Sequence, residues 1–327
     1  MCRPTDVYKR QPKILLTGKD GQVGMELQRF LPQLGEVIAL GRQELGLSKP
    51  DDLRRMIRTV RPNLIVNAAA YTAVDQAEKE EAIARAINAD APAVMAEEAQ
   101  KIGAGLVHYS TDYVFDGSKN SPYEVTDPTN PLNVYGKTKL MGERAIQETG
   151  VPHLIFRTAW VYATRGRNFL LTILRLGTQG SDDLRIVSDQ IGAPTLSGEI
   201  ALATTQILKQ IYGRDDGLAY LTEMSGMYHM TAVGETNWYE FAKAIFEEAS
   251  RMPHSAPWFA AATGGRPFVA RRIIPIPTEQ YPTPARRPAY SLLSNSHLTG
   301  TFGIQLPEWR AQLHSVFVDE STLVPRE

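Results

Sequence analysis

The chain has 327 residues, with 35 lysines and arginines against 36 aspartates and glutamates, for a formal net charge of −1. This balance argues against nucleic acid as a partner, which favours a basic excess, and gives no polybasic signal for a membrane surface. No apolar run approaches the roughly 18–20 residues of a spanning helix. The only cysteine, Cys2, cannot form an internal disulfide, which excludes a disulfide scaffold and fits the cytoplasm.

Strands and helices alternate regularly through the first half of the chain. Residues 1–11 lack apolar periodicity, and we interpret them as a disordered leader. The pattern then predicts strands at 13–17, 36–40, 63–68, 105–110 and 153–158, with helices after 21 and at 50–60, 82–101 and 133–148. Such alternation is typical of βαβ units. We therefore predict an α/β fold, a Rossmann-type doubly wound parallel sheet, with residues 12–165 forming an NAD(P)-binding domain.

The alternation of strands and helices is less regular in residues 166–327, which we predict to be a smaller, mainly substrate-binding α/β part. Helices are expected at 168–176, 199–211 and 236–249, and strands at 184–187 and 227–230 that return to the main sheet. Residues 252–288 are rich in Pro, Arg and Gly, and we interpret the part at 252–274 as a surface elaboration. This part would cap the carboxyl edge of the sheet, where α/β proteins hold their ligands.

A glycine-rich turn joins the first strand to the first helix. Gly18, Gly21 and Gly24 would allow the tight turn, the approach of backbone N–H groups to a pyrophosphate, and close packing of the helix on the strand. The alternative is an ordinary βα turn. Because the turn opens a βαβ series, we predict dinucleotide binding, with a spacing that resembles extended short-chain dehydrogenases.

The residues after the second strand bear on which dinucleotide binds. Sites that prefer NAD often place an acid there for the ribose 2′-hydroxyl, whereas this chain has Gly41 and Arg42. No carboxylate is expected to repel a 2′-phosphate, and Arg42 could pair with one. We therefore favour NADPH over NADH, with a solvated arginine as the alternative.

Tyr135 and Lys139 stand four residues apart in a predicted helix and so share a face. Thr111 follows the strand at 105–110, at the edge where catalytic groups collect. Reduction of a ketone needs a proton donor, and a nearby ammonium would lower the phenol pKa toward neutrality. A surface Tyr/Lys pair is the alternative. His108, in the same strand as Thr111, is interpreted as a packed core histidine rather than a catalytic one.

Five segments together carry a specific resemblance. They are HYSTDYVFDG (108–117), PLNVYGKTK (131–139), FRTAWVY (156–162), DQIGAPT (189–195) and YPTPARRP (281–288). The chain resembles the dTDP-4-dehydrorhamnose reductase family from about residue 13 to 309. The resemblance implies NADPH-dependent reduction of the 4-keto group of dTDP-4-dehydro-6-deoxy-L-mannose to dTDP-L-rhamnose, by a monomer or homodimer.

Individual roles follow from the matching positions. Tyr135 would be the general acid, and Lys139 would bind the nicotinamide ribose and tune Tyr135. Thr111 would hold the 4-oxo group, Asp112 would touch the substrate, and Trp160 would pack on the sugar.

The remaining matched positions concern the two phosphate-bearing ligands. Arg286 and Arg287 would reach the substrate diphosphate, with a structural loop anchor as the alternative. The residues that would line the cofactor after the glycines are Gln22, Val23, Ala69, Ala70 and Thr72.

Some members of this family use Mg²⁺ at a dimer contact. Glu26, Glu199 and Asp319 stand near the matching positions. Lone surface carboxylates are the alternative.

Two other functions stay open at this point. An epimerase or dehydratase on the same fold would retain and recycle NAD, although the sequence Thr111-Asp112-Tyr113 lacks the Asp-Glu pair expected for dehydration. A non-catalytic binding protein is the third possibility, because the regulatory subunit of methionine adenosyltransferase resembles this reductase. The intact set of Thr111, Tyr135 and Lys139 favours an enzyme.

Overall fold

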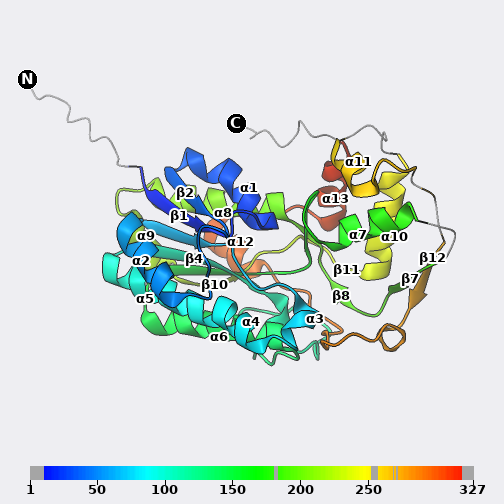
Figure 1. The fold of residues 1–327 in the computed structure, drawn as a ribbon, viewed down its shortest axis with the longest axis horizontal. Helices are drawn as coiled ribbons and strands as arrows, with labels where there is room; N and C mark the ends of the chain where they lie inside the picture. Colours follow the sequence, from blue (N-terminus) through cyan, green and yellow to red (C-terminus); the bar gives the residue numbers. More distant parts are fainter. Residues whose placement is uncertain (1–10, 180–182, 252–256, 268, 270–271, 319–327) are drawn as a thin grey trace, which may run out of the picture.

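The computed structural model describes residues 11–179, 183–251, 257–267, 269 and 272–318. Figure 1 shows a parallel sheet between helices on the left and a smaller, mainly helical part on the right. Most of the predicted leader lies outside the described residues. Within the described part of the chain, no helix has both the length and the apolar character needed to cross a membrane.

Six strands of the described chain form one parallel sheet in the order β10-β5-β4-β3-β1-β2. Their bounds are β1 Lys13–Thr17, β2 Glu36–Leu40, β3 Leu64–Asn67, β4 Gly105–Thr111, β5 His153–Thr158 and β10 Gly226–His229. The chain moves outward from β1 to β2 and then crosses back to place β3 on the other side of β1. This reversal creates a switch point at the carboxyl edge between β1 and β3, where doubly wound sheets bind ligands.

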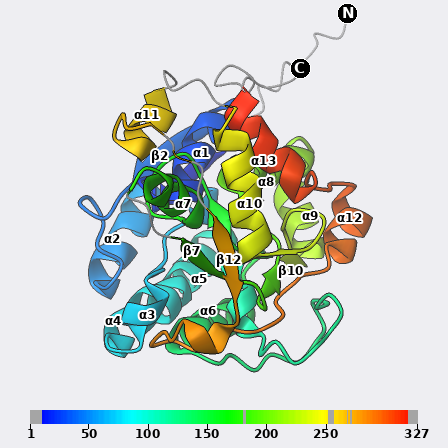
Figure 2. The ribbon, with the colours of Figure 1, turned by 90° about the vertical axis from the view of Figure 1, so that its right-hand side faces the viewer.

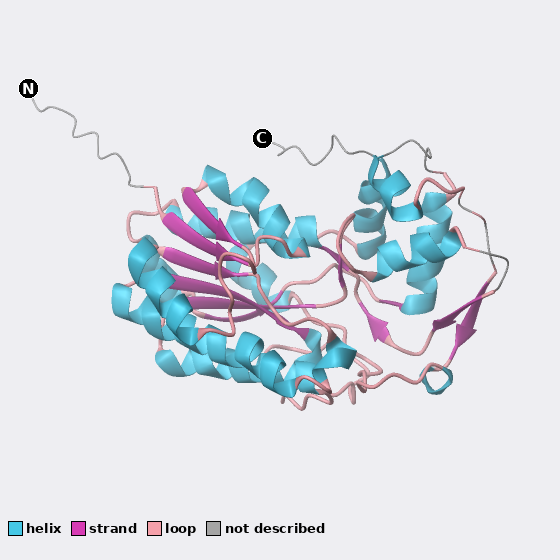
Figure 3. Ribbon diagram, viewed as in Figure 1, coloured by secondary structure: helices cyan, strands magenta, loops and turns pink. Residues whose placement is uncertain are grey.

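Helices cover both faces of the sheet, as seen in Figures 1 and 3. Ile14 and Leu16 of β1 pack in one buried cluster with α1 (Gln22–Phe30) and α8 (Ser197–Tyr212). Leu15, between them, points to the opposite cluster. That second cluster contains residues of α2 (Pro50–Val60), α5 (Ala91–Ile102) and α6 (Val134–Thr149). Burial on both faces explains why the strands lack polar–apolar alternation.

The helix predicted at 82–101 is divided into three pieces. Helix α4 (Glu81–Arg85) is followed by a π-helical turn, Ala86–Asp90, and then by α5. The side chain of Asn88, inside this turn, is buried and accepts a hydrogen bond from Tyr71 N at 2.8 Å. The turn therefore ties the helix to the loop that follows β3, which leads into the short helix α3 (Val74–Ala77).

The smaller part has its own apolar core. It packs α7 (Phe169–Gly177), α10 (Trp238–Ala249), α11 (Pro257–Thr263) and α13 (Trp309–Val318) around residues such as Phe241. Figure 2 shows α10 beside the ladder of β7 and β12. The other elements are β6 Val161–Tyr162, β8 Ile191–Gly192, β9 Thr195–Leu196, β11 Thr236–Asn237, α9 Gly217–Glu223, α12 Ser296–Phe302, and 3-10 turns at Leu31–Gln33, Asp112–Val114 and Thr278–Gln280.

The two strands predicted to rejoin the main sheet behave differently. β10 pairs with β5 in the main sheet. The prediction for 184–187 is wrong, because β7 (Leu184–Val187) pairs with β12 (Ile273–Ile276) in a separate two-stranded ladder. The first two residues of β12, Ile273 and Ile274, belong to the stretch that we interpreted as a surface elaboration, so the end of that stretch has a structural role.

Candidate active site

The glycine turn forms a narrow junction between β1, α1 and the loop after β3. Gly18 has φ +78°, and a Cβ there would lie 2.6 Å from Ala69 N. Gly24 packs against the backbone of Gly18, leaving no room for a side chain. Gly21 is the N-cap of α1 and supplies no side-chain cap, so the first N–H groups of the helix are available to an anion. These features fit a dinucleotide pyrophosphate.

The other predicted cofactor residues surround this junction. Ala69 and Ala70 are half-buried in the loop that touches Gly18, and Thr72 is exposed at the end of that loop. Val23 is half-buried and packs on the sheet core. The Gln22 amide oxygen accepts a hydrogen bond from Asn168 Nδ2 at 2.8 Å, which connects the turn to the start of α7.

Two carboxylates lie at the end of β2, contrary to the sequence-based expectation. Glu44 accepts a hydrogen bond from Gly41 N at 2.9 Å and forms an ion pair with Lys19. Asp20, from the glycine turn, lies directly against the Cα of Gly41. The expectation was wrong because it considered only residues next to the strand, whereas these two arrive from a turn on each side. Arg42 is exposed beside them.

The three predicted catalytic residues come from β4 and α6. Thr111 is the last residue of β4, and its hydroxyl donates to Asp112 Oδ1 at 3.0 Å. Tyr135 lies in the first turn of α6, where Asn133 caps the helix by accepting from Gly136 N at 2.8 Å. A hydrogen bond with Thr111 lowers the pKa of Tyr135, which places the two hydroxyls together.

Burial dominates the titration of this site. It raises the pKa of Tyr135 to about 12, outweighing the hydrogen bond with Thr111. The pKa of Tyr135 is therefore raised, and not brought toward neutrality as expected; the tuning role of Lys139 stays a prediction. Lys139 Nζ donates to Tyr109 O at 2.6 Å and lies 3.1 Å from His108 Nε2.

Asp112 is a buried carboxyl beside the catalytic threonine. Only 2% of its surface is exposed, and burial raises its pKa to about 6 against the opposing hydrogen bonds of Ser291 and Thr111. A carboxyl in this position can change charge near neutral pH.

Trp160 stands just after β5 with φ +47°, a left-handed conformation rare for a bulky residue. Its ring stacks on Trp238, with centroids 3.6 Å apart and planes 8° apart. Trp238 also donates from Nε1 to Gln190 Oε1 at 3.1 Å. The sequence-based reasoning missed Trp238, and its place in a helix 78 positions later gave no signal of the stack.

The two adjacent arginines have different surroundings. Arg287 binds Asp75 through Nη1 and Nη2, at 3.0 and 2.8 Å, and donates to Thr283 Oγ1. This assigns Arg287 to the loop-anchor alternative, tying the Pro-rich loop to α3. Arg286 has an exposed side chain that forms no ion pair with any other described residue, and its carbonyl oxygen accepts from Asn133 Nδ2 at 2.8 Å.

The predicted magnesium ligands find no support. Glu26 already pairs with Arg29 at 2.8 Å and Arg165 at 2.6 Å, so its charge is compensated. Glu199 lies in the first turn of α8, and Asp319 is outside the described residues. Over the described ranges, no group of three His, Cys, Asp or Glu side chains is arranged to hold a metal.

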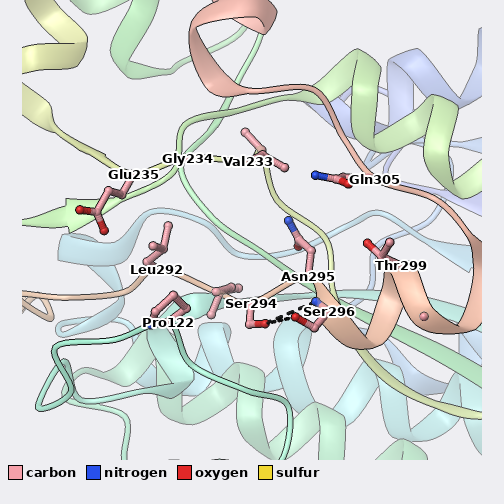
Figure 4. A pocket seen from close by; sticks show the side chains of 13 residues that line it. Pro122, Val233, Gly234, Glu235, Leu292, Ser294, Asn295, Ser296, Thr299 and Gln305 are labelled. Carbon is pink, nitrogen blue, oxygen red and sulfur yellow. Dashed lines mark hydrogen bonds between the residues drawn. The ribbon is translucent and has the colours of Figure 1, made fainter.

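A cavity of about 570 Å³ lies in the second half of the chain (Figure 4). None of the predicted site residues lines it. Two of its polar side chains are already hydrogen-bonded: Asn295 Oδ1 accepts from Thr231 N at 3.1 Å, and Ser294 Oγ donates to Ser296 Oγ at 2.9 Å. The cavity is therefore separate from the junction of the catalytic and glycine-turn residues.

Comparison with known proteins gives a consistent result over almost the whole chain. The family described as RmlD substrate binding domain matches residues 12–322. The dTDP-4-dehydrorhamnose reductase of Burkholderia thailandensis is 50% identical over 298 residues, covering 91% of this chain and 95% of the relative. The enzyme of the same name from Escherichia coli is 43% identical, covering 91% and 94%.

Solved structures agree with the sequence relatives. A dTDP-4-dehydrorhamnose reductase from Clostridium acetobutylicum superposes with a TM-score of 0.81 at 35% identity, covering 93% of this chain and 98% of that one. The reductase from Bacillus anthracis, in complex with NADP, gives 0.80 at 31% identity, covering 94% and 99%. A Thermus thermophilus UDP-glucose 4-epimerase with NAD gives 0.69 at 18% identity, covering 93% and 98%, which shows a shared fold only.

Proposed function

This chain belongs to the RmlD substrate-binding-domain family, and on that premise we propose that it is an NADPH-dependent dTDP-4-dehydrorhamnose reductase. It reduces the 4-keto group of dTDP-4-dehydro-6-deoxy-L-mannose to the alcohol of dTDP-L-rhamnose, consuming NADPH and one proton. The observation that carries this is the meeting of Thr111 with Tyr135 at the carboxyl edge of the sheet, beside the glycine turn.

The residues act on the two sides of the ketone. The nicotinamide supplies the hydride when it is bound. Thr111 donates a hydrogen bond to the 4-oxo atom, which stabilises negative charge as it develops there. Tyr135 then transfers its proton to that oxygen. A phenol whose pKa is raised to about 12 keeps its proton at neutral pH, so it acts as an acid toward a more basic alkoxide.

Binding uses local positive potential, because the chain has no net basic charge. The N-terminus of α1 takes the cofactor pyrophosphate, and Arg42 pairs with the 2′-phosphate of NADPH. Lys139 binds the nicotinamide ribose. For the substrate diphosphate we assign Arg286, since the guanidinium of Arg287 is held by Asp75.

The substrate sugar lies between Asp112 and the Trp160–Trp238 stack, which presents an aromatic surface to the pyranose ring. Residues 12–165 supply most of the cofactor contacts and residues 166–327 most of the substrate contacts. The enzyme works in the cytoplasm as a monomer or homodimer.

One assay tests this function and separates it from the alternatives. The purified protein is mixed with enzymatically made dTDP-4-dehydrorhamnose and NADPH, then with NADH, and the nicotinamide absorbance is followed. Stoichiometric oxidation with formation of dTDP-L-rhamnose supports the proposal. Tightly held NAD with no net consumption would favour an epimerase, and no reaction at all would favour a binding protein.

Tyr135→Phe gives the sharpest prediction for the chemical step. The variant keeps the ring, which lies edge-on to Tyr113 with centroids 5.9 Å apart, and loses only the proton donor. We expect kcat to fall by about 10²–10⁴-fold with an unchanged NADPH dissociation constant, measured by steady-state kinetics and fluorescence titration. Retained kcat would exclude Tyr135 as the acid. Tyr113→Phe serves as a matched control at the neighbouring phenol.

A further inference from the structure

A chain of buried polar side chains runs from the glycine turn to α6. Thr17 Oγ1 donates to Asn67 Oδ1 at 2.8 Å, and Asn67 Nδ2 lies 3.0 Å from His108 Nδ1. His108 Nε2 in turn lies 3.1 Å from Lys139 Nζ. Each of the four side chains is at most 1% exposed. These side chains therefore contact one another directly across β1, β3 and β4, and His108 is hydrogen-bonded on both ring nitrogens.

The donors and acceptors along this chain fix where the histidine proton lies. Asn67 Oδ1 also accepts from Ala69 N, at 3.2 Å, so this oxygen is turned away from the imidazole. The Asn67 amide nitrogen, which can only donate, then faces His108 Nδ1. Nδ1 must accept, and a neutral ring carries its single hydrogen on Nε2, directed at Lys139.

This arrangement discriminates between the two charge states of Lys139. An ammonium offers only hydrogens and would meet the Nε2–H of His108 donor to donor. A neutral amine accepts that hydrogen while still donating to Tyr109 O. Burial acts in the same direction, because it lowers the pKa of Lys139 to about 8 and holds the pKa of His108 well below its usual range.

We propose that His108, held by Asn67, is a positioning residue that fixes the Lys139 nitrogen one helical turn from Tyr135 and sets its charge. The proposal rests on the proposed reductase role of Lys139. Charging Lys139 requires the imidazole proton to move from Nε2 to Nδ1 and the Asn67 amide to turn over. That turn breaks the hydrogen bond from Ala69 N, in the loop that would line the dinucleotide.

Other charged groups around Lys139 bear on its titration. Glu143, on α6 itself, raises the pKa of Lys139, but burial outweighs it. Arg157 of β5 binds both carboxylate oxygens of Glu143, at 2.9 and 2.7 Å, which compensates much of that negative charge. Asp112, from the turn after β4, acts on Tyr135. His108 remains the group that faces the Lys139 nitrogen from β4.

The first test reads the tautomer directly and needs no substrate. Long-range ¹H–¹⁵N NMR of the histidine-labelled protein at about pH 9.5, above the pKa of about 8 at which Lys139 loses its charge, should show a neutral His108 with hydrogen on Nε2. The chain has six histidines, so the signal is assigned by its loss in His108→Gln. A ring protonated on Nδ1, or an imidazolium, would overturn the proposal whether or not the protein reduces a sugar.

The second test changes the tautomer of His108 through Asn67→Asp, a substitution that keeps the side-chain volume. Asn67→Asp places a carboxylate oxygen opposite Nδ1, which draws the hydrogen to Nδ1 and leaves Nε2 to accept from a charged Lys139. His108→Gln offers Lys139 an amide oxygen and removes the tautomer constraint. His153→Gln is the matched control, because that buried histidine, at the start of β5 and opposite Leu106, directs its Nδ1 at Val151 O and not at this chain of polar side chains.

The readout is the pH dependence of the NADPH dissociation constant, measured by fluorescence between about pH 6.5 and about pH 10, a range that brackets the lowered pKa of Lys139 and ends just below the ordinary pKa of lysine. Wild-type binding should weaken as the pH rises through about 8, because the neutral amine no longer attracts the anionic cofactor. We expect this break to move up by roughly one pH unit in Asn67→Asp and His108→Gln, and to stay in place in His153→Gln.

A break at the same pH in all four proteins, or none in the wild type, would overturn the role of His108. Thermal unfolding shows that each variant is folded, and a purely structural role would change its midpoint without moving the break. If the sugar assay fails while the break moves as expected, the proposed substrate is wrong and the control of Lys139 stands.

Discussion

Asp112 shows how one buried carboxyl affects both the site and the stability of the chain. Thr111 donates to its Oδ1, and it has almost no contact with solvent. A site that recognises a sugar needs buried acceptors of this kind, and each one left charged destabilises the fold. Asp112 is therefore a place where function and stability conflict.

The stability effect has a definite sign. Because the pKa of Asp112 is raised to about 6 in the folded state from 3.8, the folded protein binds the extra proton between these values, and stability falls as the pH rises through this window. Asp112→Asn should abolish that loss, gaining roughly 2–3 kcal/mol over wild type at pH 7.5 and little at pH 4. Urea unfolding at both pH values checks this. An equal difference at both would contradict it.

At the scale of elements, the sequence predicted what depends on local pattern. The bounds of β1, β2, α2 and β5 agree with the predicted ranges, because each combines an apolar run with a flanking turn signal. The pairing of β7 with β12 was not predictable, since it joins residues 89 positions apart whose pairing no local pattern records. The π-helical turn at Ala86–Asp90 likewise depends on the tertiary contacts of Asn88.

The candidate site divides in the same way. The spacing of the glycines and the interval between Tyr135 and Lys139 can be read from the sequence, because these residues lie close together along the chain. The Trp160–Trp238 stack, the anchoring of Arg287 and the carboxylates beside Gly41 are contacts across the fold. His108 was correctly placed in the core, but its partners on β3 and α6 could not be read from the sequence.

Helix α6 carries Tyr135 and Lys139, and a buried ion pair anchors it to β5. Glu143 and Arg157 are 1% and 3% exposed, so the loss of one partner leaves a buried charge uncompensated. Glu143→Gln should reduce the free energy of unfolding by about 3–5 kcal/mol, whereas the double variant Glu143→Leu with Arg157→Met should recover most of it. Urea unfolding measures both.

The exposed pair Arg214–Asp216 provides the control for that measurement. Its removal by Asp216→Asn should leave the free energy of unfolding almost unchanged, since water screens the interaction. If the double variant of the buried pair proved as unstable as Glu143→Gln alone, packing rather than uncompensated charge would explain the loss.

At the scale of the whole molecule, both halves of the chain contribute to the main sheet and to the apolar core under α1 and α8. β10 and α8 belong to the second half of the chain by sequence, yet β10 extends the main sheet beside β5 and α8 covers its face next to α1. The cofactor-binding part therefore takes a strand and a helix from residues that follow the first substrate-side helix. The predicted boundary at residue 165 separates the residues expected to bind the cofactor from those expected to bind the substrate, but it does not separate two folding units.

This interdependence predicts how an isolated fragment behaves. Residues 12–165 alone would lack α8, exposing Leu16 and Phe156 to water, and would leave β5 as an unpaired apolar edge. We expect this fragment to aggregate or to bind the dye ANS strongly, with no cooperative unfolding transition and no NADPH binding. Adding the complementary fragment 166–327 during refolding should restore cooperative unfolding and NADPH binding, because that fragment supplies β10 and α8. Calorimetry and fluorescence titration measure the two outcomes. A fragment that unfolded cooperatively and bound NADPH unaided would show that the first half is an independent domain after all.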